Sequence, residues 1–147
     1  MTLHSVRGQA LYVAPIRIGL GIVWYLLARL AGLGQASALL AAGGSVFVVV
    51  FVWFNDPRTA FRLDRAPAPA PPDAVYAGRL RQALAATVPS TVGVSVLAAA
   101  ALAWKPALTA VLGGISAGLG VAGLLHALRA DPTLWFDRRG KGVYRRP

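Results

Sequence analysis

Residues 107–128 read ALTAVLGGISAGLGVAGLLHAL, a stretch of 22 residues without a single Lys, Arg, Asp or Glu. A helix of about 20 apolar residues crosses the hydrocarbon core of a bilayer. Three further stretches of similar length carry few or no charged residues: 11–33, 36–54 and 82–104. Because a segment in lipid must satisfy its own backbone hydrogen bonds, we expect each stretch to be a helix. The pattern predicts an all-α integral membrane protein with four transmembrane helices.

The composition excludes two other classes of protein. The 147 residues are 56% hydrophobic and only 14% charged, yet their net charge is +10. A soluble domain has roughly 25% charged residues, and a disordered basic tail is poor in apolar side chains. The chain has no cysteine, which excludes a disulfide framework, a thiolate metal site and a thiol nucleophile.

Short connections predict that the four helices form two tandem hairpins. Gly34 and Gln35 join the first two helices, and Lys105 and Pro106 join the last two. The resulting parts are a first transmembrane hairpin (1–54), a Pro/Arg-rich linker (55–81), a second hairpin (82–128) and a basic tail (129–147). The linker contains the run APAPAPP at 66–72, which favours a solvated polyproline II spacer.

The basic residues predict an orientation. Twelve of them lie in the N-terminus, linker and tail, whereas Arg29 and Lys105 flank the other ends of the helices. The positive-inside rule therefore predicts that both termini and the linker are cytoplasmic. A composition rich in Ala, Arg, Val and Pro suggests the inner (cytoplasmic) membrane of a bacterium. Residues 36–38 resemble a signal-peptide cleavage site, but Arg17 interrupts the apolar stretch before them, so we expect the first helix to stay in the chain.

The two hairpins show a weak internal similarity. At an offset of 74 or 75 residues the coinciding pairs include Pro15 with Pro89, Gly19 with Gly93, Asp56 with Asp131 and Pro57 with Pro132. This predicts a parallel repeat about an axis along the membrane normal, although 16 Gly and 10 Pro also make chance matches easy. After each Asp-Pro pair we expect either a short interfacial helix, capped by the aspartate, or a simple basic flank.

Arg17 and His126 are the candidate residues for binding a ligand or a lipid phosphate. Arg17 lies about six residues inside the first predicted span, where it either snorkels to the headgroups or faces the bundle and holds an anion. No acidic residue lies in any predicted helix to neutralise it. His126 is expected near the cytoplasmic end of the fourth helix, either as an interfacial residue or as a ligand. His4 is the other histidine, so we expect no metal site.

Small residues predict close packing between helices. Those in the second and fourth predicted helices are Gly43, Gly44, Gly113, Gly114, Ser116, Gly118, Gly120 and Gly123. Gly114 and Gly118 form a GxxxG pair. The pattern leaves open whether the neighbouring helix belongs to this chain or to another one.

The basic cytoplasmic residues are expected to contact anionic lipid of the inner leaflet. They are Arg58, Arg62, Arg138, Arg139, Lys141, Arg145 and Arg146. Lipid is the nearer anionic partner, so we do not expect nucleic acid. The other expected partners are copies of this chain or further membrane subunits.

The sequence contains no Walker loop, GxSxG or HExxH motif, and we predict neither catalytic residues nor a cofactor. The leading hypothesis is a non-enzymatic structural or accessory subunit, a scaffold within a homo-oligomer or larger membrane complex. The alternative is a small transporter or channel that uses Arg17 for an anion or lipid headgroup. A lipid-modifying enzyme using Arg17 and His126 is a third hypothesis, which lacks a nucleophile.

Overall fold

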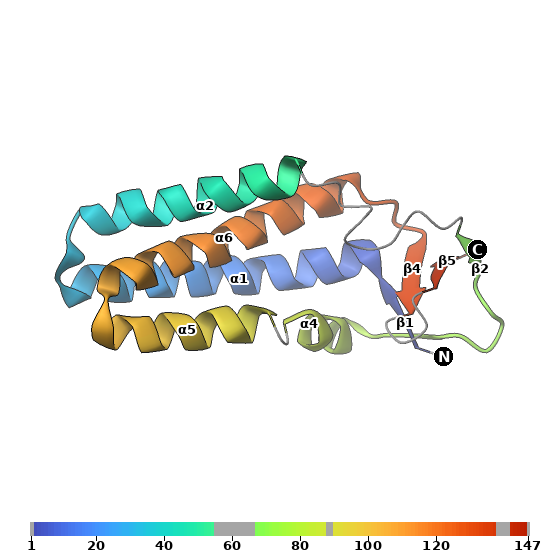
Figure 1. Ribbon diagram of the computed structural model, residues 1–147. Coiled ribbons are helices and arrows are strands. Elements are labelled where there is room, and N and C mark those ends of the chain that lie inside the picture. Colours follow the sequence, from blue (N-terminus) through green and yellow to red (C-terminus); the bar gives the residue numbers. More distant parts are fainter. Residues whose placement is uncertain (1, 55–66, 88–89, 138–141, 147) are drawn as a thin grey trace.

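A computed structural model of the chain describes residues 2–54, 67–87, 90–137 and 142–146. It is 74% helical, and three of its helices are long and apolar enough to cross a membrane. The expected predominance of helices is therefore confirmed, and the three long apolar helices are consistent with the expected membrane character. Figure 1 shows the helices as an elongated bundle with a small group of strands at one end.

The first two long helices are α1, Val6–Ala28, and α2, Ala36–Phe54. The side chain of Ser5 caps α1 by accepting a hydrogen bond from the backbone N–H of Gly8 at 3.0 Å. At its other end α1 continues into a wider helical turn, η1, Arg29–Leu33. Gly32 and Gly34 then take positive φ values of 100° and 57°, which glycine adopts easily, and these residues turn the chain into α2.

The third predicted span is described in two parts. Helical structure covers α4, Arg79–Thr87, and α5, Ser90–Trp104, in the region predicted as one helix over 82–104. Residues 88 and 89 between them, including the Pro89 that coincides with Pro15 in the predicted repeat, lie outside the described residues. The 15 residues of α5 alone rise about 22 Å, so a crossing of the roughly 30 Å hydrocarbon core would also need residues before Ser90. A fourth complete span thus stays a prediction.

The last helix, α6, Pro106–Arg129, is the centre of the bundle. It packs against α1, α2 and α5, and Figure 1 shows it crossing between α1 and α2. The helices of the first hairpin consequently touch each other little, although their connection is short. In the predicted repeat the contact of α1 with α6 would be matched by one of α5 with α2, but α6 packs extensively on α1, whereas α2 packs chiefly on α6. The repeat is therefore not confirmed and stays a prediction.

Five short strands form a sheet that the sequence did not predict. They are β1 (Thr2–Ser5), β2 (Ala68–Pro69), β3 (Val75–Tyr76), β4 (Leu134–Asp137) and β5 (Val143–Arg145), in the order β2-β5-β4-β1-β3. β4 is antiparallel to both of its neighbours. An interfacial helix after Asp131 is therefore wrong, because β4 occupies this place. Leu3, Trp135 and Val143 are buried and form a small core of their own.

The linker covers both edges of this sheet. β2 pairs in parallel with β5 at one edge, and β3 pairs in parallel with β1 at the other. Short strands that contain or adjoin proline protect sheet edges from pairing with other chains. The sheet joins the N-terminal strand, the linker and the tail at a single end of the bundle, as Figure 1 shows.

Candidate functional site

Backbone-to-backbone contacts join α6 to α1. A β-carbon added to Gly120 would stand 2.8 Å from the carbonyl oxygen of Ala14, so the two helices approach too closely for a larger residue. Gly113 meets Gly21 in the same way. Between these contacts Ser116 donates a hydrogen bond from Oγ to the carbonyl oxygen of Arg17 at 3.0 Å. The small residues of α6 thus form one tight seam with α1.

A second seam joins α6 to α2 on a neighbouring face. A β-carbon on Gly118 would stand 2.7 Å from the carbonyl oxygen of Ser45, and one on Gly114 would overlap Ala41. The contact is mutual, because Gly44 of α2 in turn approaches the carbonyl oxygen of Val111 in α6. Ser45 Oγ donates to the carbonyl oxygen of Gly114 at 2.8 Å. The GxxxG pair of α6 is therefore used within this chain.

The remaining neighbour, α5, is joined to α6 by the same kind of hydrogen bond. Thr109 Oγ1 donates to the carbonyl oxygen of Ala98 at 3.0 Å, and both residues are fully buried. Gly123 makes only ordinary contact with α1, since its added β-carbon would lie 3.8 Å from Ala10. Gly43, which the sequence groups with the packing residues, is exposed and has no atom within 4 Å of such a β-carbon. It takes no part in the packing inside this chain.

Arg17 reaches across the bundle to the start of α5. Its Nε donates to Thr91 Oγ1 at 2.9 Å, and its Nη2 donates to Ser90 Oγ at 3.0 Å. The guanidinium group is half-buried against these two neutral hydroxyl groups. The side chain thus links α1 to α5. Each hydroxyl group, acting as an acceptor toward Arg17, keeps its own proton to donate elsewhere.

His126 lies apart from Arg17. It occupies the last turn of α6, and its carbonyl oxygen accepts a hydrogen bond from the backbone N–H of Ala130 at 2.9 Å. Ser116, which contacts Arg17, precedes His126 by ten residues, or about 15 Å along the helix. The two candidate residues therefore do not form one site, and this separation removes the geometry that a joint catalytic role would need.

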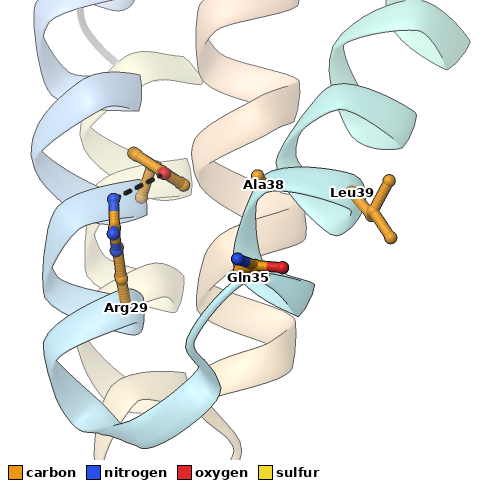
Figure 2. A pocket seen from close by; sticks show the side chains of 5 residues that line it. Arg29, Gln35, Ala38 and Leu39 are labelled. Carbon is orange, nitrogen blue, oxygen red and sulfur yellow. Dashed lines mark hydrogen bonds between the residues drawn. The ribbon is translucent and has the colours of Figure 1, made fainter.

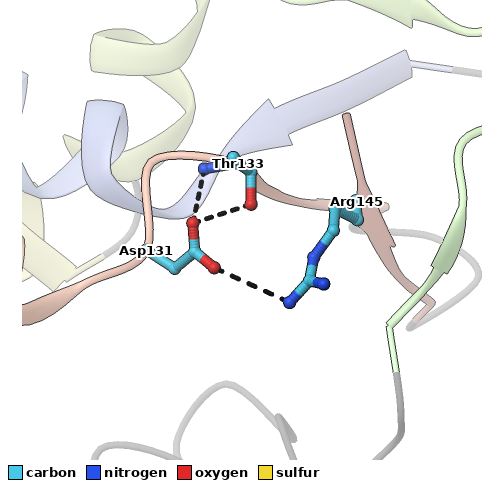
Figure 3. A network of polar contacts seen from close by, with 3 residues as sticks. All are labelled: Asp131, Thr133 and Arg145. Atoms are coloured by element: carbon cyan, nitrogen blue, oxygen red, sulfur yellow. Dashed lines mark hydrogen bonds and ion pairs between the residues drawn. The ribbon is translucent and has the colours of Figure 1, made fainter. Parts of the chain in front are cut away.

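Two of the candidate lipid-binding residues lie on the sheet. Arg145 pairs with Asp131 at 3.8 Å on an exposed surface, and Asp131 also accepts hydrogen bonds from the side chain and the backbone N–H of Thr133 (Figure 3). The hydrogen bonds from Thr133 lower the pKa of the Asp131 carboxyl group, and the charge of Arg145 adds to this effect. The other candidates, Arg58, Arg62, Arg138, Arg139 and Lys141, lie outside the described residues.

Aromatic residues hold the last described arginine. The Arg146 guanidinium lies 4.6 Å from the ring centre of Tyr76 and 5.7 Å from that of Trp135. The two rings meet edge to face at 4.8 Å. A similar contact joins the helices, where Arg129 lies 3.8 Å from the ring centre of Trp53. Cation–π contacts of this kind use the basic residues structurally, a role that the sequence analysis did not assign to them.

A pocket of about 440 Å³ lies at the end of the bundle opposite the sheet. Figure 2 shows Arg29 on the η1 side, and Gln35, Ala38 and Leu39 on the α2 side. Tyr25 completes the lining, and its hydroxyl group accepts a long hydrogen bond of 3.5 Å from Arg29 Nη1. The sequence did not single out these residues as a site. Its one indication was an isolated basic residue, Arg29, shortly before Gly32 and Gly34.

Within the described ranges, no group of three or more His, Asp or Glu side chains is placed to hold a metal ion. Comparisons with protein-family models, curated proteins and solved structures found no match to this chain.

Proposed function

We propose that this protein is a non-enzymatic scaffold or accessory subunit of a membrane assembly. Its partners are copies of the chain or other membrane subunits. The observation that carries the proposal is the division of the glycines: those of α6 pack inside the chain, whereas Gly43 of α2 faces outward with open space around it. In this proposal the interior of the bundle stabilises the fold, and the outer surface binds the partner subunits.

The outer face of α2 has the properties of a helix-packing surface. Leu39, Gly43, Val46, Phe47 and Val50 are all exposed and follow helical spacing along one side. Glycine between larger apolar residues leaves a notch into which a second helix can pack closely in lipid. Because α2 packs chiefly on α6, most of its surface stays available to such a partner.

A transporter of anions or lipid headgroups is the second candidate. The observation in its favour is that Arg17 holds its charge in an apolar segment, where its partners among the described residues are the neutral Ser90 and Thr91. The scaffold is better supported because those bonds use Arg17 to join α1 to α5. The close contacts of α6 with its neighbours also fill the centre of the bundle.

The charge distribution supports an orientation with the sheet on the cytoplasmic side of a bacterial inner membrane. On α4, which lies at that end, Leu80 and Leu84 are exposed one helical turn apart and Arg79 and Arg81 flank Leu80. This combination suits a helix on an anionic membrane surface. A cytoplasmic reporter fused after Pro147 is expected to be active. Activity of a periplasmic reporter alone would contradict the orientation.

The mass of the purified protein in mild detergent, combined with a flux measurement, tests the proposal. A mass above that of the monomer, or co-purification with other subunits, together with vesicles that conduct no anions, is the expected result. A monomer that carries anion or lipid flux, with the flux lost in Arg17→Gln, would replace the scaffold by the transporter.

A further inference from the structure

A pocket lies between η1 and the start of α2, at the end of the bundle away from the sheet. Its η1 side is polar and is lined by Tyr25 and Arg29, while Gln35 adds an amide at the edge of the α2 side. The rest of the α2 side is apolar, and its Leu39 is 78% exposed. A volume of about 440 Å³ falls within the range of small-molecule sites. The pocket therefore offers polar donors to one part of a ligand and an apolar surface to another.

Arg29 brings a positive charge to this pocket, and none of the described acidic residues lies near it. Its guanidinium group is exposed and donates a long hydrogen bond to a neutral hydroxyl group. The described aspartates Asp73, Asp131 and Asp137 belong to the opposite end of the bundle, where the sheet lies. A guanidinium group has five N–H donors in a planar fork that matches two oxygens of a phosphate. An anionic phosphate is thus the group that best complements Arg29.

The place of the pocket indicates where the phosphate comes from. The apolar helices end here, and Trp104 with Lys105 lies at the same end of the bundle, as expected where a bilayer meets water. The turn through Gly32 and Gly34 leads from the polar side to the apolar one. A phospholipid beside the bundle would place its headgroup at this level and its acyl chains along α2.

We propose that this pocket binds the phosphate of an anionic phospholipid in the leaflet at the end of the bundle away from the sheet. Arg29 makes the charge-assisted hydrogen bonds, and Tyr25 and Gln35 supply neutral ones. Leu39 contacts the glycerol backbone and the first carbons of the acyl chains. The proposal requires the helices to span a membrane but does not depend on the scaffold function.

Native mass spectrometry of the full chain, with phosphatidylglycerol added to the detergent micelles, tests this site. We expect Arg29→Gln to weaken retention of one lipid roughly tenfold, because a charge-assisted contact is lost. Lys105→Gln is the matched control, since it removes a basic residue at the same end that lies 5.3 Å from the ring centre of Trp104. Its lipid retention is expected to equal that of the wild type.

Inorganic phosphate distinguishes the two sources of the same group. Failure of millimolar phosphate to displace the lipid supports the lipid site, whereas full displacement would reassign the pocket to a soluble phosphate. Equal lipid retention by wild type and Arg29→Gln, or equal losses in Arg29→Gln and Lys105→Gln, would overturn the proposal. Circular dichroism of each variant verifies that the helices are intact.

Discussion

Gly21 of α1 and Gly113 of α6 meet backbone to backbone. A β-carbon on Gly21 would stand 2.6 Å from the carbonyl oxygen of Gly113, and one on Gly113 would stand 3.0 Å from that of Gly21. The contact is reciprocal, so neither helix can move aside without separating from the other. Dispersion contacts between two backbones that approach this closely take the place of the hydrophobic driving force, which is absent between helices in lipid. The position of α6 at the centre of the bundle follows from contacts of this kind.

Substitution of Gly113 by alanine is expected to destabilise the bundle. The added methyl group meets the backbone of α1, and overpacking of this kind costs about 1–3 kcal/mol. The unfolding free energy in mixed detergent micelles measures the effect. Gly19→Ala is the control, because nothing lies within 4 Å of its added β-carbon and alanine favours the helix. Equal stability of Gly113→Ala and Gly19→Ala would contradict the seam.

Replacement of Arg17 by methionine is expected to loosen the start of α5. Both hydrogen bonds to α5 disappear. A hydrogen bond that involves a charged group contributes about 1.5–3 kcal/mol to stability. Hydrogen exchange of the backbone amides in the first turns of α5 measures this change. Thr91→Val removes one of the two acceptors with little change of shape, so a smaller increase in exchange is expected. Unchanged exchange in Arg17→Met would show that Arg17 does not join the helices.

Part of this arrangement could be read from the sequence. The stretches with few or no charged residues predicted the long helices, and the glycines of 113–120 predicted tight packing. The sequence could not assign the two faces of α6, because Gly113 and Gly114 are adjacent in the chain yet face different helices, α1 and α2. That distinction depends on the tertiary arrangement of helices that are similar in composition.

The sheet was beyond reach for a different reason. The strands have only two to four residues, too few for an alternating pattern, and their partners are distant in the chain: Leu3 pairs with Asp137. Length and hydropathy predicted one helix over 82–104, and the structure adds that helical structure already begins at Arg79.

Truncation of Leu3 to alanine is expected to disrupt the sheet and leave the bundle intact. Leu3 is fully buried between the strands, and the loss of such a side chain costs about 2–5 kcal/mol. The sheet holds the linker through β2 and β3, so faster proteolysis within 67–78 is the expected readout. Val75→Ala, at an exposed position of β3, serves as the control. Helical content should stay unchanged in both variants, and its loss in Leu3→Ala would show that the sheet and the bundle unfold together.

Acidification is expected to weaken the turn before β4. The pKa of Asp131 is lowered by hydrogen bonds from the side chain and the backbone N–H of Thr133. Between the folded and unfolded pKa values the unfolded chain binds more protons, so the contribution of Asp131 to stability rises with pH in that window. It is complete above the unfolded pKa and is lost as pH falls through the folded one. Exchange of the Thr133 amide across the acidic range measures this loss, and Asp131→Asn should abolish the pH-dependent part.

Cross-linking at Gly43 tests the proposed scaffold most directly. The chain contains no cysteine, so Gly43→Cys introduces one thiol on the outer face of α2, and Gly93→Cys introduces a matched thiol on the exposed side of α5. After oxidation in native membranes, we predict a cross-linked species with a second copy or another subunit for Gly43→Cys and none for Gly93→Cys. A monomer in both variants, or equal cross-linking in both, would contradict association through α2.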